Sequence, residues 1–421
     1  MKPPEIALGF FLLLTVGTYW RHRSVLYPPF IFCSMWSLVL AIDCLHLIKV
    51  DPVHDNTLYI VCAGALAFSA GGWLAGTVPR ELLAIHLFPK QPPVEARFLR
   101  NLLVGILLCA LPVMFYEVLQ LARGGTGFGI LMRAREAQVE AAQHGETIHS
   151  LVLDYFVMLA TLTSLLFATE RRDFRFWIVT IVALVGCILS TGRTSLLLLI
   201  AGLCAIHLLH SKKESLLAAL RLLRWPILLF VTLYVVLIFT NKNTKGMTGR
   251  ATGVAQYFVL SYIVGPLSAF DTVVQNPIYY SGMPDHTFEF PLKIAAAMNL
   301  TSYTPPPKLD TFVMVPFPTN VYTVFKFYFI DVGTIGIIVL FLGFGLVHSL
   351  LYLKARHGGR FSTYLFAFSV YAALIVTFDD AYYAAGIYLR AFAFGLLYLM
   401  LTSTRLSLSM GKPGIAEDLS S

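Results

Sequence analysis

Arg193 stands alone between two apolar stretches in the segment LVGCILSTGRTSLLLLI at 184–200. Thr191 and Gly192 can turn the chain between two membrane helices, which leaves the arginine close to the bilayer surface. A cation in that position loses hydration, so we expect it to bind a fixed anion, and a lipid-borne diphosphate is the obvious candidate. The alternative is that the long side chain reaches toward water or lipid headgroups.

Two further segments contain basic residues that could hold a phosphate. The segment NKNTKGMTGR at 241–250 has no acidic residue, and its glycines and hydroxyls suit a loop that wraps an anion. In RAREAQVEAAQ at 133–143, Arg133 has Glu136 at helical spacing, whereas Arg135 has no such partner and is freer to bind a ligand. Solvated surface loops are the alternative. The predicted diphosphate contacts are Arg193, Arg135, Arg250, Lys245 and Arg133.

A general base could come from several residues on the predicted outer side: His149, Asp271, Asp285, His286, Glu289 and Asp331. His286 and Glu289 follow the turn-forming GMP at 282–284, so they could project into a cleft. Histidine is suited to deprotonate a hydroxyl near neutral pH, and a carboxylate would serve in a dry cleft. The candidate catalytic residues are therefore His286, Asp271 and Glu289, and the sequence does not choose among them.

Charged residues inside apolar segments are costly and usually point inward. They occur here as Asp43, Glu117, Asp154, Asp331, Asp379, Asp380 and Arg390. We predict an ion pair between Arg390 and the Asp379–Asp380 pair, and packing or interface roles for His207 and His348. The sequence has no metal-ligand spacing, Walker loop or dinucleotide fingerprint, so we predict neither a metal nor a cofactor. Energy would then come from an activated substrate or from an ion gradient.

The composition places these residues in a membrane. The chain has 421 residues, of which 57% are hydrophobic and 13% are charged, with a mean hydropathy of +0.73. A soluble domain carries about 25% charged residues, so we predict a polytopic membrane protein. The net charge of +8 is then distributed by side of the membrane and does not indicate nucleic-acid binding. All six cysteines lie in apolar stretches, which predicts buried thiols.

The predicted fold is all-α, a single integral membrane domain over 1–421 with about eleven transmembrane helices. The predicted segments are 5–20, 25–48, 58–77, 99–121, 148–169, 175–191, 194–210, 222–240, 328–352, 362–380 and 385–404. Over half of the 31 lysines and arginines fall in alternate connections, which places the N-terminus outside and the C-terminus inside.

Two long connections are then outside, a first loop at 122–147 and a large periplasmic loop at 241–327. Within the large loop, YFVLSYIVGPLSAFDTVV at 257–274 predicts a helix in the outer interface, broken near Gly265 and Pro266. The proline-rich stretch at 303–318 predicts an extended segment over the outer face.

Several of these motifs resemble the oligosaccharide repeat-unit (O-antigen) polymerases of bacterial inner membranes. The resemblance rests on STGRTS at 190–195, YIVGPLSAFD at 262–271, NVYT at 320–323 and FIDVGTIG at 329–336. Together with the order of the spans it covers most of residues 100–400. It implies a metal-independent glycosyltransferase, related in architecture to the O-antigen ligases, that joins glycans carried on undecaprenyl diphosphate.

The resemblance also implies residue roles and partners. Arg193 would hold the diphosphate by motif position, with Arg135 and Arg250 assigned by loop position, and His286 could stand for the loop histidine of the ligases. The expected partners are the lipid-linked oligosaccharide, the bilayer and a chain-length regulator. The alternatives are a carrier of lipid-linked glycans or other anions, an O-antigen ligase, and a non-catalytic assembly or sensor protein.

Overall fold

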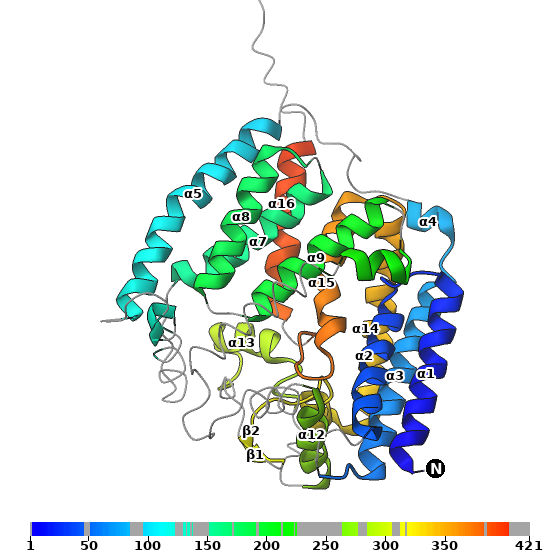
Figure 1. Ribbon diagram of the computed structural model, residues 1–421. Coiled ribbons are helices and arrows are strands. Elements are labelled where there is room, and N and C mark those ends of the chain that lie inside the picture. Colours follow the sequence, from blue (N-terminus) through cyan, green and yellow to red (C-terminus); the bar gives the residue numbers. More distant parts are fainter. Residues whose placement is uncertain are drawn as a thin grey trace, which may run out of the picture.

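The computed structural model describes residues 2–45, 51–84, 96–122, 129–131, 133–134, 137, 151–170, 172–190, 193–211, 214–222, 224, 263–276, 284–304, 312–315, 318–382 and 385–403 (Figure 1). Its helices are α1 (Pro3–His22), α2 (Pro28–Cys44), α3 (Asp55–Ala75), α4 (Arg80–Ala84), α5 (Ala96–Leu121), α7 (Leu151–Thr169), α8 (Phe174–Leu189), α9 (Arg193–Ser211), α12 (Gly265–Gln275), α13 (Glu289–Ala297), α14 (Lys326–Arg356), α15 (Arg360–Ile375) and α16 (Ala385–Ser403). The strands β1 (Val313–Met314) and β2 (Pro318–Thr319) form a short antiparallel ladder.

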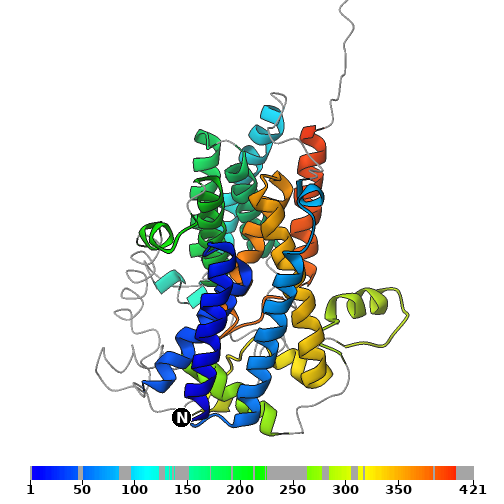
Figure 2. The same cartoon turned by 90° about the vertical axis from the view of Figure 1, so that its right-hand side faces the viewer.

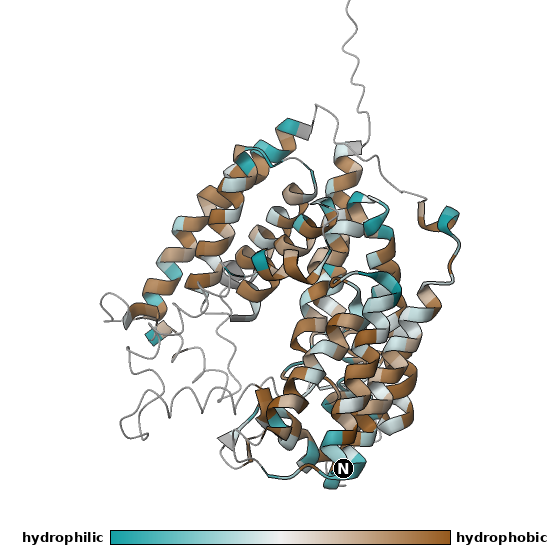
Figure 3. Ribbon diagram, turned by 45° about the vertical axis from the view of Figure 1, so that its right-hand side comes forward, coloured by the Kyte–Doolittle hydropathy of each residue, from teal (hydrophilic) through white to brown (hydrophobic). Residues whose placement is uncertain are grey.

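The chain is an all-α membrane protein. Five described helices are long and apolar enough to cross a bilayer: Asp55–Ala75, Arg97–Leu121, Thr194–Ser211, Lys326–Arg356 and Ala385–Thr402. Four shorter helices are also apolar: Pro28–Cys44, Tyr155–Thr169, Phe174–Leu189 and Arg360–Ile375. Every predicted segment except 222–240 coincides with a helix, and nearly all of that segment lies outside the described residues. Apolar residues run along the long helices in Figure 3.

One group of helices consists of α1, α2, α3 and α14, with α12 packed against its lower end as viewed in Figure 1. α3 and α14 form the most extensive helix pair. They approach so closely because glycines face the neighbouring backbone: a Cβ at Gly345 would lie 2.0 Å from the carbonyl oxygen of Phe68. Close approach through small residues is how helices gain contact in a membrane, where lipid is as apolar as a leucine side chain.

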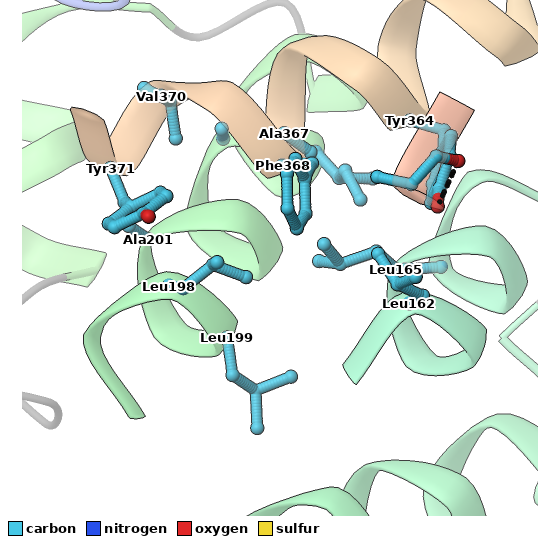
Figure 4. Close-up of a cluster of buried hydrophobic side chains, with 14 of the residues drawn as sticks. Leu162, Leu165, Leu198, Leu199, Ala201, Tyr364, Ala367, Phe368, Val370 and Tyr371 are labelled. Atoms are coloured by element: carbon cyan, nitrogen blue, oxygen red, sulfur yellow. Dashed lines mark hydrogen bonds between the residues drawn. The ribbon is translucent and has the colours of Figure 1, made fainter. Parts of the chain in front are cut away.

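The second group consists of α5, α7, α8, α9, α15 and α16, and α15 also packs against α14. Its core includes Leu165 on α7, Leu199 on α9 and Phe368 on α15, all buried (Figure 4). The Tyr364 hydroxyl donates a hydrogen bond of 3.0 Å to the Ala391 carbonyl, which joins α15 to α16. These contacts pack α7, α9, α15 and α16 against one another.

Buried ion pairs join this second group at its upper end. Glu170, after α7, accepts from Arg360 of α15 and from the Tyr398 hydroxyl of α16, the latter at 3.1 Å. Arg100 of α5 donates to Asp173 at 2.8 Å, and Asp173 caps α8 by accepting from the Phe176 amide. The carboxylate of Glu170 is fully buried. Burying such charges is tolerated because each is paired and hydrogen-bonded.

α14 is interrupted near its lower end. Gly333 has φ 63° and ψ −166°, a conformation that is accessible almost only to glycine. The turn of helix before it, which carries Asp331, therefore leaves the line of the long helix.

The segment predicted to lie in the outer interface is helical from Gly265, but its helix, α12, is largely buried against α3 and α14. Residues 257–262 of that prediction lie outside the described residues. The predicted extended segment contains the β1–β2 ladder. The cysteines carry free thiols as predicted, but only Cys33 and Cys187 are buried, and Cys109 is exposed on α5.

Candidate functional site

His286 and Asp331 form a hydrogen-bonded pair at the lower end of the bundle. Asp331 Oδ1 lies 3.1 Å from His286 Nδ1, and its Oδ2 accepts from the amides of His286 and Thr287 at 3.0 and 2.5 Å. Residue Asp331 is only 2% exposed. A buried carboxylate that accepts from three donors holds both the position of the loop and the orientation of the imidazole ring.

Local sequence explains why the two residues meet. Pro284 begins a turn in which its carbonyl accepts from the Phe288 amide at 3.0 Å, and α13 starts at Glu289. The turn directs the amides of residues 286 and 287 toward α14. On α14, the interruption at Gly333 comes two residues after Asp331 and turns this part of the helix toward the loop.

Among the described residues, Nε2 of His286 has no hydrogen-bond partner and is available for chemistry. When Nδ1 carries the proton and donates it to Asp331, Nε2 keeps a lone pair that can accept a proton. The ring stacks on Phe327 at 4.8 Å between centroids, and the side chain is 25% exposed. A half-sheltered histidine with an oriented ring and a carboxylate behind it has the geometry of a general base.

Tyr303 lies beside the pair, among several carboxylates. The Tyr303 hydroxyl donates to the Asp285 carbonyl at 2.8 Å. Burial, followed by the nearby carboxylates of Glu289, Asp285 and Asp331, raises the pKa of Tyr303 to about 12. Glu289 itself pairs with Lys293 one turn along α13, so its carboxylate is already engaged.

The third candidate base, Asp271 on α12, has a structural position. Its Oδ1 accepts from the Thr57 hydroxyl at 2.6 Å and the His54 amide at 3.1 Å, and its Oδ2 lies 2.8 Å from His54 Nδ1. Asp271 thereby satisfies donors at the start of α3, as a helix-capping side chain does. We assign it to positioning. His54, whose side chain is 64% exposed, was not among the sequence candidates.

A buried cation lies near the same site. Lys326 is 5% exposed, and its ammonium lies 3.8 Å from the centroid of the Tyr322 ring and 5.0 Å from that of Phe327. Phe327 thus contacts both the lysine and His286. The aromatic faces stabilise the ammonium through cation–π attraction.

The predicted diphosphate contacts fall mostly outside the described residues. Arg135, Lys245 and Arg250 lie outside them altogether. Arg193 is the first residue of α9, at the lower end of the bundle, but its side chain lies outside the described part. Arg133 is described and exposed.

The predicted ion pair of Arg390 is wrong. Its guanidinium carbon lies 5.2 Å from the centroid of the Tyr155 ring, and within the described ranges Arg390 forms no ion pair with Asp379, Asp380 or any other carboxylate. Asp380 Oδ1 accepts instead from the Tyr382 amide at 2.8 Å.

His348 has partners that the sequence did not indicate. It is buried in α14, with Nδ1 3.0 Å from the Tyr382 hydroxyl and Nε2 3.1 Å from the Ser369 hydroxyl. Its packing role is therefore combined with hydrogen bonds to α15 and to the loop that follows α15. His207 lies within hydrogen-bonding distance, 3.1 Å, of Arg172 near the upper end.

Among the described residues, no group of three or more His, Cys, Asp or Glu could hold a metal ion. Comparison of the chain with known protein families, curated proteins and solved structures gave no match.

Proposed function

We propose that the protein is a glycosyltransferase that polymerises undecaprenyl diphosphate-linked oligosaccharide repeat units at the periplasmic face of a bacterial inner membrane. Its supports are the sequence resemblance and the His286–Asp331 pair, which supplies the base that such a reaction needs. The proposal includes eleven spans, an N-terminus in the periplasm and a C-terminus in the cytoplasm. The lower end of Figure 1, where α12 and α13 lie, is then periplasmic. The proposal assigns the loops 122–147 and 241–327 to the periplasm.

The proposed reaction needs only the chain's own side chains. His286 Nε2 takes the proton of an acceptor sugar hydroxyl while the oxygen attacks the anomeric carbon of the donor. The bond from that carbon to the diphosphate oxygen breaks, its electron pair leaves with undecaprenyl diphosphate, and the carbon inverts. Asp331 stabilises the imidazolium that forms, and the proton passes to water afterwards.

The departing diphosphate needs cations to stabilise its new charge. Guanidinium groups fixed near the membrane surface act strongly there because the dielectric is low. Arg193 is proposed for this role, with Arg135, Arg250, Lys245 and Arg133 as further contacts. An activated lipid-linked donor makes a nucleotide or metal unnecessary.

The decisive experiment mixes the purified full-length protein in detergent with lipid-linked repeat units, a chelator and no nucleotide. We expect laddered products from the wild type and at least about a 100-fold slower ladder from His286→Gln, the lower range for loss of a general base. His54→Gln changes the other histidine–carboxylate pair and serves as the matched control. No ladder from the wild type would overturn the proposal.

The same assay separates a polymerase from a ligase. Adding lipid A core as acceptor gives ladders on the carrier lipid if the chain is a polymerase. It gives glycan on lipid A if the chain is a ligase.

A second candidate function is a proton-coupled carrier of lipid-linked glycans. The observation that favours it is the buried chain of Ser369, His348 and Tyr382, because ionisable groups inside membrane bundles often carry protons. Proteoliposomes with a pH gradient test it: a carrier dissipates the gradient only with substrate present, and His348→Ala abolishes that flux.

A further inference from the structure

Arg390 is the only charged residue of α16, whose sequence is AGIYLRAFAFGLLYLMLTS. It lies in the second turn, close to the lower end of the bundle, and it is exposed. A guanidinium in an apolar membrane helix is costly unless something compensates its charge. Within the described residues, no carboxylate forms an ion pair with Arg390.

The face of α16 that carries Arg390 is turned toward α13. Residues four apart lie on one face of a helix, so Gly386 and Arg390 point in the same direction. A Cβ added at Gly386 would lie 3.2 Å from Phe290 of α13. Both views show α13 lying across the direction of the long helices, just below the start of α16 (Figures 1 and 2). Arg390 is therefore one turn above the contact with α13.

Tyr155 of α7 orients the guanidinium. Its ring centroid is 5.2 Å from the guanidinium carbon, and its side chain is also exposed. A ring over one face of the group leaves the N–H edge free to grip an anion with two hydrogen bonds. Leu389 and Phe392, on either side of Arg390 in the sequence, are exposed apolar residues that could contact a lipid tail.

We infer that Arg390 contacts the diphosphate of the lipid-linked substrate, beside Tyr155 of α7 and one turn from the contact between α16 and α13. His286 lies in the turn that leads into α13, and Phe290 of α13 faces Gly386 of α16. Arg390, which would bind the anion, and His286, which would act as the base, are therefore at the same end of the bundle. The inference rests on the proposed function for the identity of the substrate. The chemistry it requires is a diphosphate on a polyprenyl chain.

The test measures binding of undecaprenyl diphosphate to the full-length protein in phosphatidylcholine nanodiscs. Arg390→Ala should weaken binding about tenfold to a hundredfold, the loss expected for charge-assisted hydrogen bonds. The affinity of Arg390→Lys should lie between those of wild type and Arg390→Ala, because a lysine keeps the charge without the paired donors. Arg390→Gln preserves most of the volume and serves if the alanine variant unfolds.

The matched control is Lys293→Ala, which removes a positive charge from α13 where it already pairs with Glu289. It should leave the dissociation constant within about twofold of wild type, since exposed pairs contribute little. Wild-type affinity in Arg390→Ala overturns the inference. So does an equal loss of affinity for phosphatidylglycerol, because Arg390 would then be a general headgroup anchor.

The two proposals fail in different ways. Wild-type protein that binds undecaprenyl diphosphate through Arg390 but builds no ladder contradicts the polymerase and leaves the diphosphate contact standing. Wild-type ladders with an unchanged KM for the donor in Arg390→Ala contradict the contact alone.

Discussion

Asp331 accepts hydrogen bonds from both the main-chain amide and the imidazole ring of His286, a residue 45 positions earlier in the chain. The carboxylate belongs to the short lower part of α14, and the histidine belongs to the turn before α13. The buried carboxylate of Asp331 fixes both the loop and the ring of His286. Since Asp331 lies two residues before the interruption of α14 at Gly333, the position of the base depends on that interruption.

Asp331→Asn should slow chain extension by at least about 100-fold, the lower range for loss of general-base catalysis. The asparagine oxygen can still accept from the two amides, but its NH₂ group would face Nδ1 and move the ring proton to Nε2, where the base is needed. The measurement is the initial rate of ladder formation by purified protein.

Its control is Asp271→Asn, which alters the other histidine–carboxylate pair. We expect Asp271→Asn to lower the midpoint of thermal unfolding. The rate of chain extension per folded molecule should change little. A rate in Asp331→Asn above half the wild-type value would remove Asp331 from the mechanism.

Gly333→Ala should destabilise the protein by about 1–3 kcal/mol, the usual cost of a strained backbone conformation. Its φ of 63° with ψ of −166° suits glycine and not alanine. Gly343→Ala is the control in the same helix, since a Cβ there meets nothing within 4 Å and alanine is the better helix former. Thermal unfolding in detergent compares them, and equal midpoints would contradict the strain at Gly333.

Arg360→Ala should cost about 3–5 kcal/mol, because it leaves the buried carboxylate of Glu170 with too few cations. Arg97→Ala removes an exposed arginine of α5 and should change the unfolding free energy by less than about 0.5 kcal/mol. The double variant Arg360→Ala with Glu170→Gln should recover part of the loss. Denaturant unfolding in detergent gives all three values, and no recovery would count against an unpaired charge as the cause.

Tyr303 should make the protein less stable in alkali. Its folded pKa, raised from 10.0 to about 12, keeps it protonated at pH values where the unfolded chain has lost the proton. Its contribution is complete below about pH 10 and is lost as the pH rises through about 12. Wild type should therefore lose stability more steeply than Tyr303→Phe over that range, and parallel curves would contradict the raised pKa.

Hydropathy predicted where the helices lie because a membrane helix must be apolar along its whole length, and this constraint is local. It did not predict that α12 is buried, since an apolar stretch of that length suits an interface and a bundle core equally. It also did not predict the interruption of α14, because a glycine within a helix adopts a positive φ only when surrounding packing requires it.

The functional residues divide in the same way. The sequence identified His286 and Asp331 as separate bases, and it identified Arg390 as costly, because residue type alone shows which groups can titrate or carry charge. The tertiary structure decided which residues meet. Asp331 pairs with His286, Asp271 pairs with His54, and Tyr155 contacts Arg390.

By itself the sequence determined an all-α membrane protein and the residue types from which a site can be made. Only the tertiary structure decided which carboxylate faces which histidine and which arginine has no carboxylate within the described part of the chain. The physical reason is distance: hydropathy and helical spacing act over a few residues, whereas hydrogen bonds of about 3 Å between different helices depend on how the whole bundle packs.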